Sequence, residues 1–148
     1  MALIVVPALL LLGGLLDPKL IGPIGPLAAT EVVTAKFTAC SGGSAPACVI
    51  DGDTFRLGDR TIRITGIDAP EIGKPLCPAE ADLGRRSAAR LLELLNQGQF
   101  DMIAHRLQRE DRNGRSLMVV RRNGDSIGAR LIDEGLAHRY TGFKISWC

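Results

Sequence analysis

The sequence predicts a small fold of the α+β class, in which short strands curl into a closed barrel and helices pack on one side. Two observations support this fold class. After residue 48, turn residues divide much of the chain into short runs of β-forming residues. Two helical segments interrupt these runs, so the predicted order is strands, helix, strands, helix. A length of 148 residues is enough for one domain with one core.

A strong hairpin signal, Asp51-Gly52, separates the first two predicted strands, residues 48–50 and 54–57. The next predicted strand, Thr61–Ile67, alternates apolar and polar residues. This alternation directs Arg63 away from the side that packs on the core, or into a polar site.

The clearest helix of the chain is Ala79–Asn96, with Gly98 just past its end. Apolar residues at i, i+3, i+4 and i+7 predict the face of this helix that packs on the sheet. They are Ala88, Leu91, Leu92 and Leu95.

The second half of the chain contains two further strands and a second helix. Residues 99–104 and 116–121 are predicted as strands, and a hairpin-like sequence, residues 111–114, lies between them. Residues 126–134 are predicted as a helix, and the tail, residues 136–148, is short and irregular or partly helical.

Residues 1–35 differ in composition from the rest of the chain. Residues 2–16 are all apolar or glycine, which fits the apolar core of a secretion signal and is shorter than the ~20 residues of a bilayer span. Residues 17–35 are broken by glycine and proline and predict a linker, so we expect the globular domain at residues 36–148. The leader predicts an exported protein, periplasmic, secreted or tethered to the membrane through residues 2–16. A misassigned start or a disordered apolar tail is the alternative.

The globular part of the chain is mildly basic. The whole chain has 18 basic and 16 acidic residues, and residues 1–35 hold one of the basic and two of the acidic ones, which leaves a formal charge of +3. This charge is compatible with a polyanionic partner, although many ordinary domains carry as much.

The chain has four cysteines: Cys40, Cys48, Cys77 and Cys148. An even count favours two disulfides in an exported chain of this size. Of the three connectivities we favour Cys40–Cys48 with Cys77–Cys148, while a lipoprotein processing site that ends at Cys40 is an alternative. A zinc site is not indicated, because no C-x₂-C occurs and the two histidines stand apart. We interpret His105 and His138 as ordinary surface or boundary residues.

Three carboxylates and an arginine lie close together in two motifs, V-I-D-G-D-T-F and R-I-T-G-I-D-A-P-E. Asp53, Asp68 and Glu71 would repel one another at one spot unless a hard cation such as Ca²⁺, which prefers oxygen ligands, neutralised them. Arg63 would then have no counter-ion to hold and would be free for an anionic substrate. Carboxylates, a cation and an arginine are the parts needed to cleave a phosphodiester.

The motifs D-G-D-T, R-x-x-x-x-D-x-P-E and D-R-N-G-R stand in the order and spacing of the staphylococcal (thermonuclease-type) nuclease family, which the chain resembles from about Cys48 to Ala137. The resemblance implies a five-stranded OB-fold β-barrel with about three packed helices. It also implies a Ca²⁺-dependent nuclease that hydrolyses the 5′ P–O bond of DNA and RNA and leaves 3′-phosphate ends. The four-cysteine form that ends in Trp147-Cys148 is similar to bacterial members with an amino-terminal hydrophobic segment.

The resemblance also implies roles for the acidic residues. Asp53 and Asp68 match the calcium-binding carboxylates, and the backbone carbonyl of Ala69 would be a third ligand. Many members have threonine in place of Ala69, and the missing hydroxyl is expected to loosen a water contact. Glu71 matches the residue that acts as general base or orients the attacking water.

Basic and aromatic residues match the substrate-binding positions of the family. Arg63 and Arg115 match the two arginines that stabilise charge on the phosphorus. Arg112 stands where a lysine commonly meets a terminal phosphate, and Asn113 replaces a tyrosine. Tyr140 lies about one residue from the position of the base-stacking tyrosines, so we expect weaker or differently tuned substrate binding.

The function that we expect is therefore a nuclease, a monomer that acts on DNA and RNA and prefers single strands. One alternative is a non-catalytic OB-fold module that binds single-stranded nucleic acid. Against it, all five catalytic and metal positions carry the residue types that the reaction needs. A second alternative is an envelope protein that uses Ca²⁺ only for stability, and the two arginines argue against it.

Overall fold

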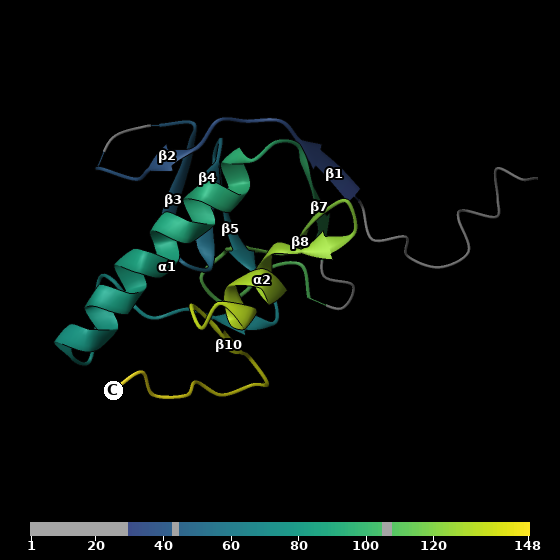
Figure 1. The fold of residues 1–148 in the computed structure, drawn as a ribbon. Helices are drawn as coiled ribbons and strands as arrows, with labels where there is room; N and C mark the ends of the chain where they lie inside the picture. Colours follow the sequence, from purple (N-terminus) through teal and green to yellow (C-terminus); the bar gives the residue numbers. More distant parts are fainter. Residues whose placement is uncertain (1–29, 43–44, 105–107) are drawn as a thin grey trace, which may run out of the picture.

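The structure, a computed structural model, describes residues 30–42, 45–104 and 108–148 (Figure 1). These residues form ten strands and two helices: β1 (Thr30–Val33), β2 (Thr38–Ala39), β3 (Ala47–Asp51), β4 (Thr54–Leu57), β5 (Arg60–Ile64), β6 (Ile67–Asp68), α1 (Pro78–Asn96), β7 (Phe100–Ala104), β8 (Ser116–Arg122), β9 (Asp125–Ser126), α2 (Ile127–Asp133) and β10 (His138–Arg139). The predicted α+β class and the alternation of strands and helices are confirmed.

Most of the strands belong to one curled, mixed sheet in the order β1-β7-β8-β5-β4-β3-β2, and β9 pairs with β8. The pairs β5–β8 and β2–β3 are parallel, whereas the other pairs are antiparallel. The central run β7-β8-β5-β4-β3 corresponds to the five strands that the family resemblance implies. A separate two-stranded sheet joins β10 to β6.

The described residues differ from the expected barrel in two ways. Their sheet is an open path from β1 to β2, so it forms a curled half-barrel rather than a closed barrel. They also contain two helices rather than about three, because the tail after β10 continues to Cys148 without a helix. Gly142 lies in this tail with φ at 109°, a conformation that cannot be part of an α-helix.

The sheet begins earlier in the chain than the predicted domain start at residue 36. β1 pairs with β7 from Thr30↔Ile103 to Val33↔Phe100, and Val33 is buried. The predicted linker is therefore wrong for residues 30–33, which belong to the domain. The short strand escapes detection because it follows a segment rich in glycine and proline, whose composition is typical of a linker.

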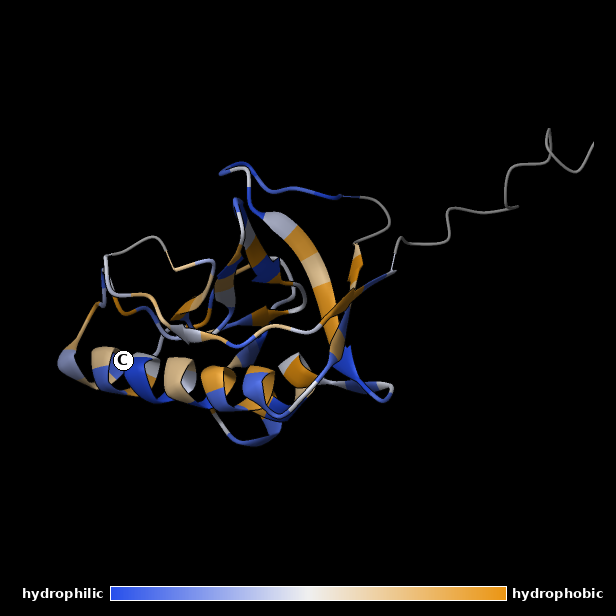
Figure 2. Ribbon diagram, turned by 90° about the horizontal axis from the view of Figure 1, so that it is seen from above, coloured by the Kyte–Doolittle hydropathy of each residue, from blue (hydrophilic) through white to orange (hydrophobic). Residues whose placement is uncertain are grey.

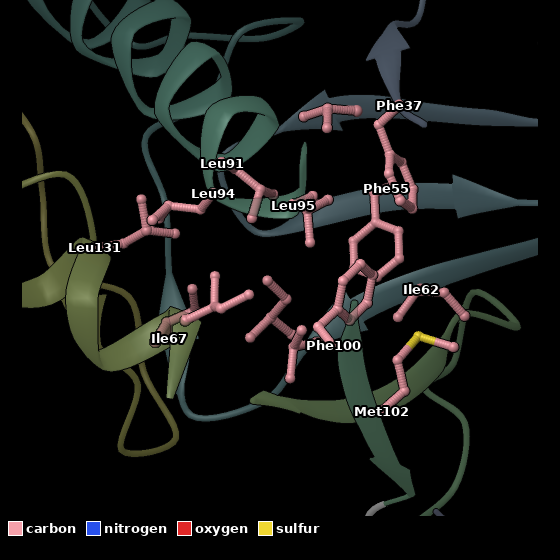
Figure 3. Close-up of a cluster of buried hydrophobic side chains, with 14 of the residues drawn as sticks. Phe37, Phe55, Ile62, Ile67, Leu91, Leu94, Leu95, Phe100, Met102 and Leu131 are labelled. Atoms are coloured by element: carbon pink, nitrogen blue, oxygen red, sulfur yellow. The ribbon is translucent and has the colours of Figure 1, made fainter. Parts of the chain in front are cut away.

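Three phenylalanines and the apolar face of α1 form the centre of the hydrophobic core (Figure 3). Phe37, Phe55 and Phe100 have ring centroids 5.5 to 6.4 Å apart. Leu91 and Leu95 of α1 are fully buried against them. Full burial of one such side chain stabilises the fold by about 1.5–3 kcal/mol. This core holds α1 against the sheet that positions the site.

The long helix α1 ends at Asn96, as predicted, and begins directly after Cys77. Apolar and polar residues occupy different faces along it (Figure 2). Its buried residues are Glu80, Gly84, Ser87, Leu91, Leu94 and Leu95. The predicted stripe is right for Leu91 and Leu95, whereas Ala88 and Leu92 lie at its half-buried edge.

The second predicted helix corresponds to α2. The Ser126 hydroxyl accepts a hydrogen bond from the N–H of Ala129 at 3.1 Å and caps the first turn. Gly135, with φ at 71°, follows the last turn. Leu131 is fully buried and fixes α2 to the core.

Both favoured disulfides are present, and all four cysteines are bonded. Cys40–Cys48, called here the loop disulfide, closes a short loop next to β3. Cys77–Cys148, called here the tail disulfide, joins residue 148 to the residue that precedes α1. A bonded Cys40 is incompatible with the alternative of lipid attachment at this residue.

Three of the sequence predictions fall partly or wholly outside the described residues: residues 2–16, most of the predicted linker, and His105. Neither helix in the described part of the chain has the length and apolar character that crossing a membrane requires. His138 is half-buried in β10, which agrees with its interpretation as a boundary residue.

Candidate active site

Asp53 lies in the turn of the β3–β4 hairpin, where Asp51 pairs with Thr54. Asp51 Oδ1 accepts a hydrogen bond from the N–H of Asp53 at 3.1 Å, which stabilises the turn. Gly52 leaves no room for a side chain, since a Cβ at this position would lie 2.7 Å from the Cβ of Ser87 in α1. Contact with α1 therefore fixes the turn and the direction of the Asp53 side chain.

Two buried carboxylates converge on one guanidinium group. Arg63 Nη2 lies 3.2 Å from Asp53 Oδ2 and 3.4 Å from Asp68 Oδ1. Asp53 also accepts hydrogen bonds from the Thr54 hydroxyl at 2.7 Å and from the N–H of Ala69 at 3.0 Å. β5 therefore supplies the cation, and the β3–β4 turn and the end of β6 supply the two acids.

Arg63 is engaged with protein groups in the structure, whereas its expected freedom for a substrate presupposes a cation bound to the carboxylates. Its second terminal nitrogen, Nη1, donates to the carbonyl oxygens of Ile67 at 3.2 Å and of Ile64 at 3.4 Å. The cause is electrostatic, because Asp53 and Asp68 are buried and the guanidinium is the cation that lies between them. The arginine is consequently held in a defined position.

Burial makes two acids of this site, Asp51 and Asp68, harder to ionise. Burial, together with the charge of Asp53, raises the pKa of Asp51 to about 7. Burial also raises the pKa of Asp68, although Lys144 opposes this change and the charge of Asp53 adds to it. Positive charge placed among these groups would favour their ionised forms.

Glu71 is linked to Asp68 through a lysine instead of meeting the two aspartates directly. Lys144 Nζ lies 2.7 Å from Glu71 Oε1 and 3.5 Å from Asp68 Oδ1. Burial disfavours the charged form of Lys144, but its hydrogen bond to Glu71 and the charges of both acids raise its pKa. The three carboxylates therefore do not meet at one point as expected. Asp53 and Asp68 form a pair, and Lys144 bridges Asp68 to Glu71.

The oxygen atoms of Asp53 and Asp68 are the best placed to hold a metal ion. Carboxylate oxygens that converge in this way fit a hard cation such as Ca²⁺. Ala69 is buried beside the pair, with its N–H bonded to Asp53. Within residues 30–42, 45–104 and 108–148, no three His, Cys, Asp or Glu side chains are grouped to hold a metal.

Arg115 immediately precedes β8, which runs parallel to β5, the strand of Arg63. The register pairs Arg63 with Leu117. Because side chains alternate along a strand, Arg115 is directed to the same face of the sheet as Leu117 and Arg63. Its ion pair in the structure is with Asp111, at 2.6 Å between Arg115 Nε and Asp111 Oδ2, rather than with an acid of the site.

The turn before β8 is organised by Asp111. Its Oδ1 accepts hydrogen bonds from the N–H groups of Asn113 at 2.9 Å and Arg115 at 3.0 Å. Burial opposes ionisation of Asp111, but the hydrogen bonds from Arg115 and Asn113 prevail and lower its pKa. Arg112 and Asn113 are exposed on this turn, and no hydrogen bond or ion pair joins their side chains to the acids of the site within the described residues.

Tyr140 lies beside Arg63, with its ring centroid 5.7 Å from the guanidinium carbon. Its N–H donates to the carbonyl of Gly66 at 3.0 Å, and the residue is 39% exposed. The structure therefore brings this aromatic ring to the site and leaves part of it accessible to a ligand. It does so although Tyr140 lies about one residue from the position of the base-stacking tyrosines of the family.

Three residues of the site receive no role in it from the sequence analysis: Asp51, Glu80 and Lys144. Glu80 is buried in the first turn of α1 and accepts hydrogen bonds from the N–H groups of Glu71 at 3.3 Å and Leu76 at 2.6 Å. Sequence features could have pointed to two of these residues. Glu80 is an acid in the first turn of a helix, where acids are favourable, and Asp51 lies two residues before Asp53 in D-G-D. No pattern in the tail indicates Lys144.

Two relatives from Bacillus subtilis (strain 168) are similar to the chain. "Endonuclease YncB" is 35% identical over 92 residues, which cover 60% of this chain and 43% of that protein. "SPbeta prophage-derived endonuclease YokF" is 34% identical over 92 residues, which cover 60% of this chain and 31% of that protein. The match therefore spans less than half of the length of each relative.

A family model described as "Staphylococcal nuclease homologue" matches residues 61–146. This range is more than half of the chain and contains Arg63, Asp68, Glu71 and Arg115, while Asp53 precedes it. The curled sheet, with α1 and α2 packed on it, agrees with the α+β fold that the motifs imply. The chain belongs to the family of staphylococcal nuclease homologues.

Proposed function

We propose that the chain is a Ca²⁺-dependent nuclease that hydrolyses phosphodiester bonds of DNA and RNA, prefers single strands and leaves 3′-phosphate ends. The observation that carries the proposal is the convergence of two buried acids, Asp53 and Asp68, on Arg63. Family membership and two relatives named as endonucleases support the reaction class. The metal, the substrate preference and the product ends rest on the resemblance of the motifs to this family.

The residues around Arg63 are suited to hold a phosphodiester and a cation together. When bound, Ca²⁺ would supply positive charge that polarises a phosphate oxygen. Asp53 and Asp68 would hold the ion through their carboxylate oxygens. Arg63 is fixed by the carbonyls of Ile64 and Ile67, so its guanidinium is oriented before the substrate arrives.

Glu71 is the residue that we assign to the attacking water. Its Oε1 is bonded to Lys144 at 2.7 Å, and its Oε2 has no hydrogen-bond partner among the side chains that the structure describes. Glu71 is half-buried at the edge of the site, where water reaches it. A carboxylate in this position can accept a proton from water, and such general-base catalysis contributes about 10²–10⁴-fold to a rate.

The residues proposed to bind the substrate differ from those common in the family. Arg115 faces the same side of the sheet as Arg63, and the partly exposed ring of Tyr140 is available to stack on a base, which is worth about 1–3 kcal/mol. Arg112 is free to contact a terminal phosphate, while Asn113 brings no aromatic hydroxyl. Inhibition by a nucleoside bisphosphate measures this grip, and affinity as tight as in tyrosine-bearing relatives would contradict the expected weaker binding.

The activity test is digestion of single-stranded DNA with Ca²⁺ and with chelator. Glu71→Gln should lower the rate by at least about 10²-fold, whereas the exposed control Glu110→Gln should leave it unchanged. Cleavage by Glu71→Gln at the wild-type rate would refute the assignment of Glu71. Binding of DNA without cleavage by the wild-type protein would favour the non-catalytic binding module.

Calcium binding is tested separately from activity, by titration calorimetry. Asp68→Asn removes one converging carboxylate and should weaken Ca²⁺ binding at least about tenfold, since ligand charge sets affinity. Asp59→Asn changes an exposed turn acid and serves as the control. Equal affinities of the two variants would place the ion elsewhere.

We also propose that the protein acts outside the cytoplasm, with residues 2–16 as a leader or a membrane tether. The two disulfides support this proposal, because such bonds persist in oxidising compartments. Fractionation of a bacterial host that produces the full chain tests it. Recovery of the chain in the cytoplasm with free thiols would contradict it.

A further inference from the structure

The carboxyl-terminal tail, residues 140–148, passes next to the acids of the site and contributes a cation to them. Lys144 Nζ contacts Glu71 Oε1 at 2.7 Å and Asp68 Oδ1 at 3.5 Å. The shorter contact makes Glu71 the main partner. This ion pair joins residues that are 73 positions apart in the sequence.

The tail is fastened on both sides of Lys144. Before it, β10 pairs with β6, where His138 lies opposite Asp68. After it, the Trp147 ring stacks on the His138 ring, with centroids 3.6 Å apart and planes 2° apart. The tail disulfide then ends the segment at Cys148. Lys144 is therefore held near Glu71 although its side chain is 58% exposed.

Glu71 depends on partners from elsewhere in the chain, because it lies in a loop without regular structure. Its backbone is positioned by Glu80, which accepts hydrogen bonds from the N–H groups of Glu71 and Leu76 and so joins the two ends of the loop. In the described part of the protein, the side-chain partner of Glu71 is Lys144. The same loop continues to Cys77, which carries the tail disulfide. Loop and tail are therefore connected by a covalent bond and by an ion pair.

We propose that Lys144 is a positioning residue for Glu71 and that the tail disulfide keeps Lys144 in place. The ammonium group holds Oε1 and thereby leaves Oε2 directed at the attacking water. A general base loses much of its effect when it is displaced by about 1 Å. This inference rests on the role of Glu71 in the proposed function, and it adds a redox-sensitive bond to the requirements for full activity.

The first test compares steady-state kinetics of the full chain and its variants with Ca²⁺ present. Lys144→Met should lower kcat about tenfold and change KM less than about twofold, because the lysine acts on Glu71 rather than on substrate binding. Lys144→Arg, which keeps the positive charge, should retain most of the wild-type kcat. Lys74→Met is the matched control, since Lys74 lines the same hollow between loop and tail. An equal loss in Lys74→Met would overturn the proposal, because it would show a general effect of charge.

The second test combines substitutions. In a Glu71→Gln background, Lys144→Met should cause no further loss of kcat, whereas an independent tenfold loss would overturn the proposal. Cys77→Ser with Cys148→Ser should lower kcat as Lys144→Met does, and adding Lys144→Met should have little further effect. Full activity in the serine variant would show that the disulfide is not required. A wild-type rate in Glu71→Gln itself would instead refute the role of Glu71 in the proposed function.

Discussion

Replacement of Asp111 by asparagine tests how the turn before β8 holds Arg115. The Asp111 carboxylate accepts hydrogen bonds from the N–H groups of Asn113 and Arg115 at 2.9 and 3.0 Å, and from Arg115 Nε at 2.6 Å. Asparagine keeps the shape of the side chain and one acceptor oxygen, but it lacks the charge that binds the guanidinium. The turn should therefore persist while the Arg115 side chain loses its partner.

The expected loss of stability comes from one hydrogen bond, between Arg115 Nε and Asp111 Oδ2, because a neutral asparagine binds the guanidinium less strongly. A hydrogen bond to a charged group contributes about 1.5–3 kcal/mol. The side chains of Asp111 and Arg115 are 16% and 30% exposed, so water screens part of the pair and we expect about 1 kcal/mol at pH 7. We also expect kcat to fall about tenfold, because a displaced Arg115 stabilises the phosphate less well in the transition state.

The loss of stability should depend on pH in a defined direction. The pKa of Asp111 in the folded protein is lower than its ordinary value of 3.8. The unfolded chain therefore binds a proton more readily, and the stabilisation by Asp111 is fully present above pH 3.8 and disappears as the pH falls through the folded pKa. Asparagine does not titrate, so the difference between wild type and Asp111→Asn should vanish in acid.

Urea unfolding at pH 7, 5 and 3, together with kcat at pH 7, measures these effects. Asp59→Asn, in an exposed turn, is the control and should change neither stability nor rate. A difference between wild type and Asp111→Asn that stays constant down to pH 3 would refute the electrostatic reasoning. An unchanged kcat would refute the assignment of Arg115 to the site.

Two further predictions concern the scaffold of the site. Gly52→Ala places a Cβ against the Ser87 hydroxyl and 2.8 Å from the Cβ of Ala69. Thermal unfolding should therefore show that the free energy of unfolding falls by about 3 kcal/mol or more. The control Gly73→Ala, which has open space around it, should leave the free energy of unfolding unchanged. The tail disulfide spans 71 residues and the loop disulfide 8, so their removal should cost about 4 and about 2.5 kcal/mol. Urea unfolding of the two serine variants tests whether removal of the tail disulfide costs more stability than removal of the loop disulfide. A larger cost for the loop disulfide would contradict loop-closure entropy as the source of the stabilisation.

Proximity in the sequence explains which parts of the site could be predicted. Asp53 lies in a hairpin turn, and Arg63 lies on the strand that pairs with its second strand, where the register sets Thr54 opposite Arg63. Asp68 follows after one tight turn. Because these contacts are local, hairpin signals and the spacing of the motifs suffice to bring the three side chains together.

Long-range contacts explain what the sequence did not reveal. Lys144 reaches Glu71 because the tail is held by the tail disulfide and by the stacking of Trp147 on His138. The disulfide was predicted, but the ring stacking and the course of the tail between these two points have no periodic pattern that could be recognised. The pairing of Arg63 with both aspartates was missed for another reason, since spacing alone does not show which charge neutralises which. β1 is four residues long, and its pairing with β7 decides its structure more than its composition does.

The charges of the site are assembled in two stages of structure. The acids Asp51, Asp53 and Asp68 come from one continuous segment, which runs from the end of β3 to β6. Arg115 joins their face of the sheet only through the parallel pairing of β8 with β5, and Lys144 arrives only with the fastened tail. Buried acids without enough positive charge are unfavourable, as the raised pKa of Asp51 shows. Lys144 therefore offsets part of the negative charge that the local fold gathers around Asp68, so loss of the tail contact should impair catalysis before it disperses the acids.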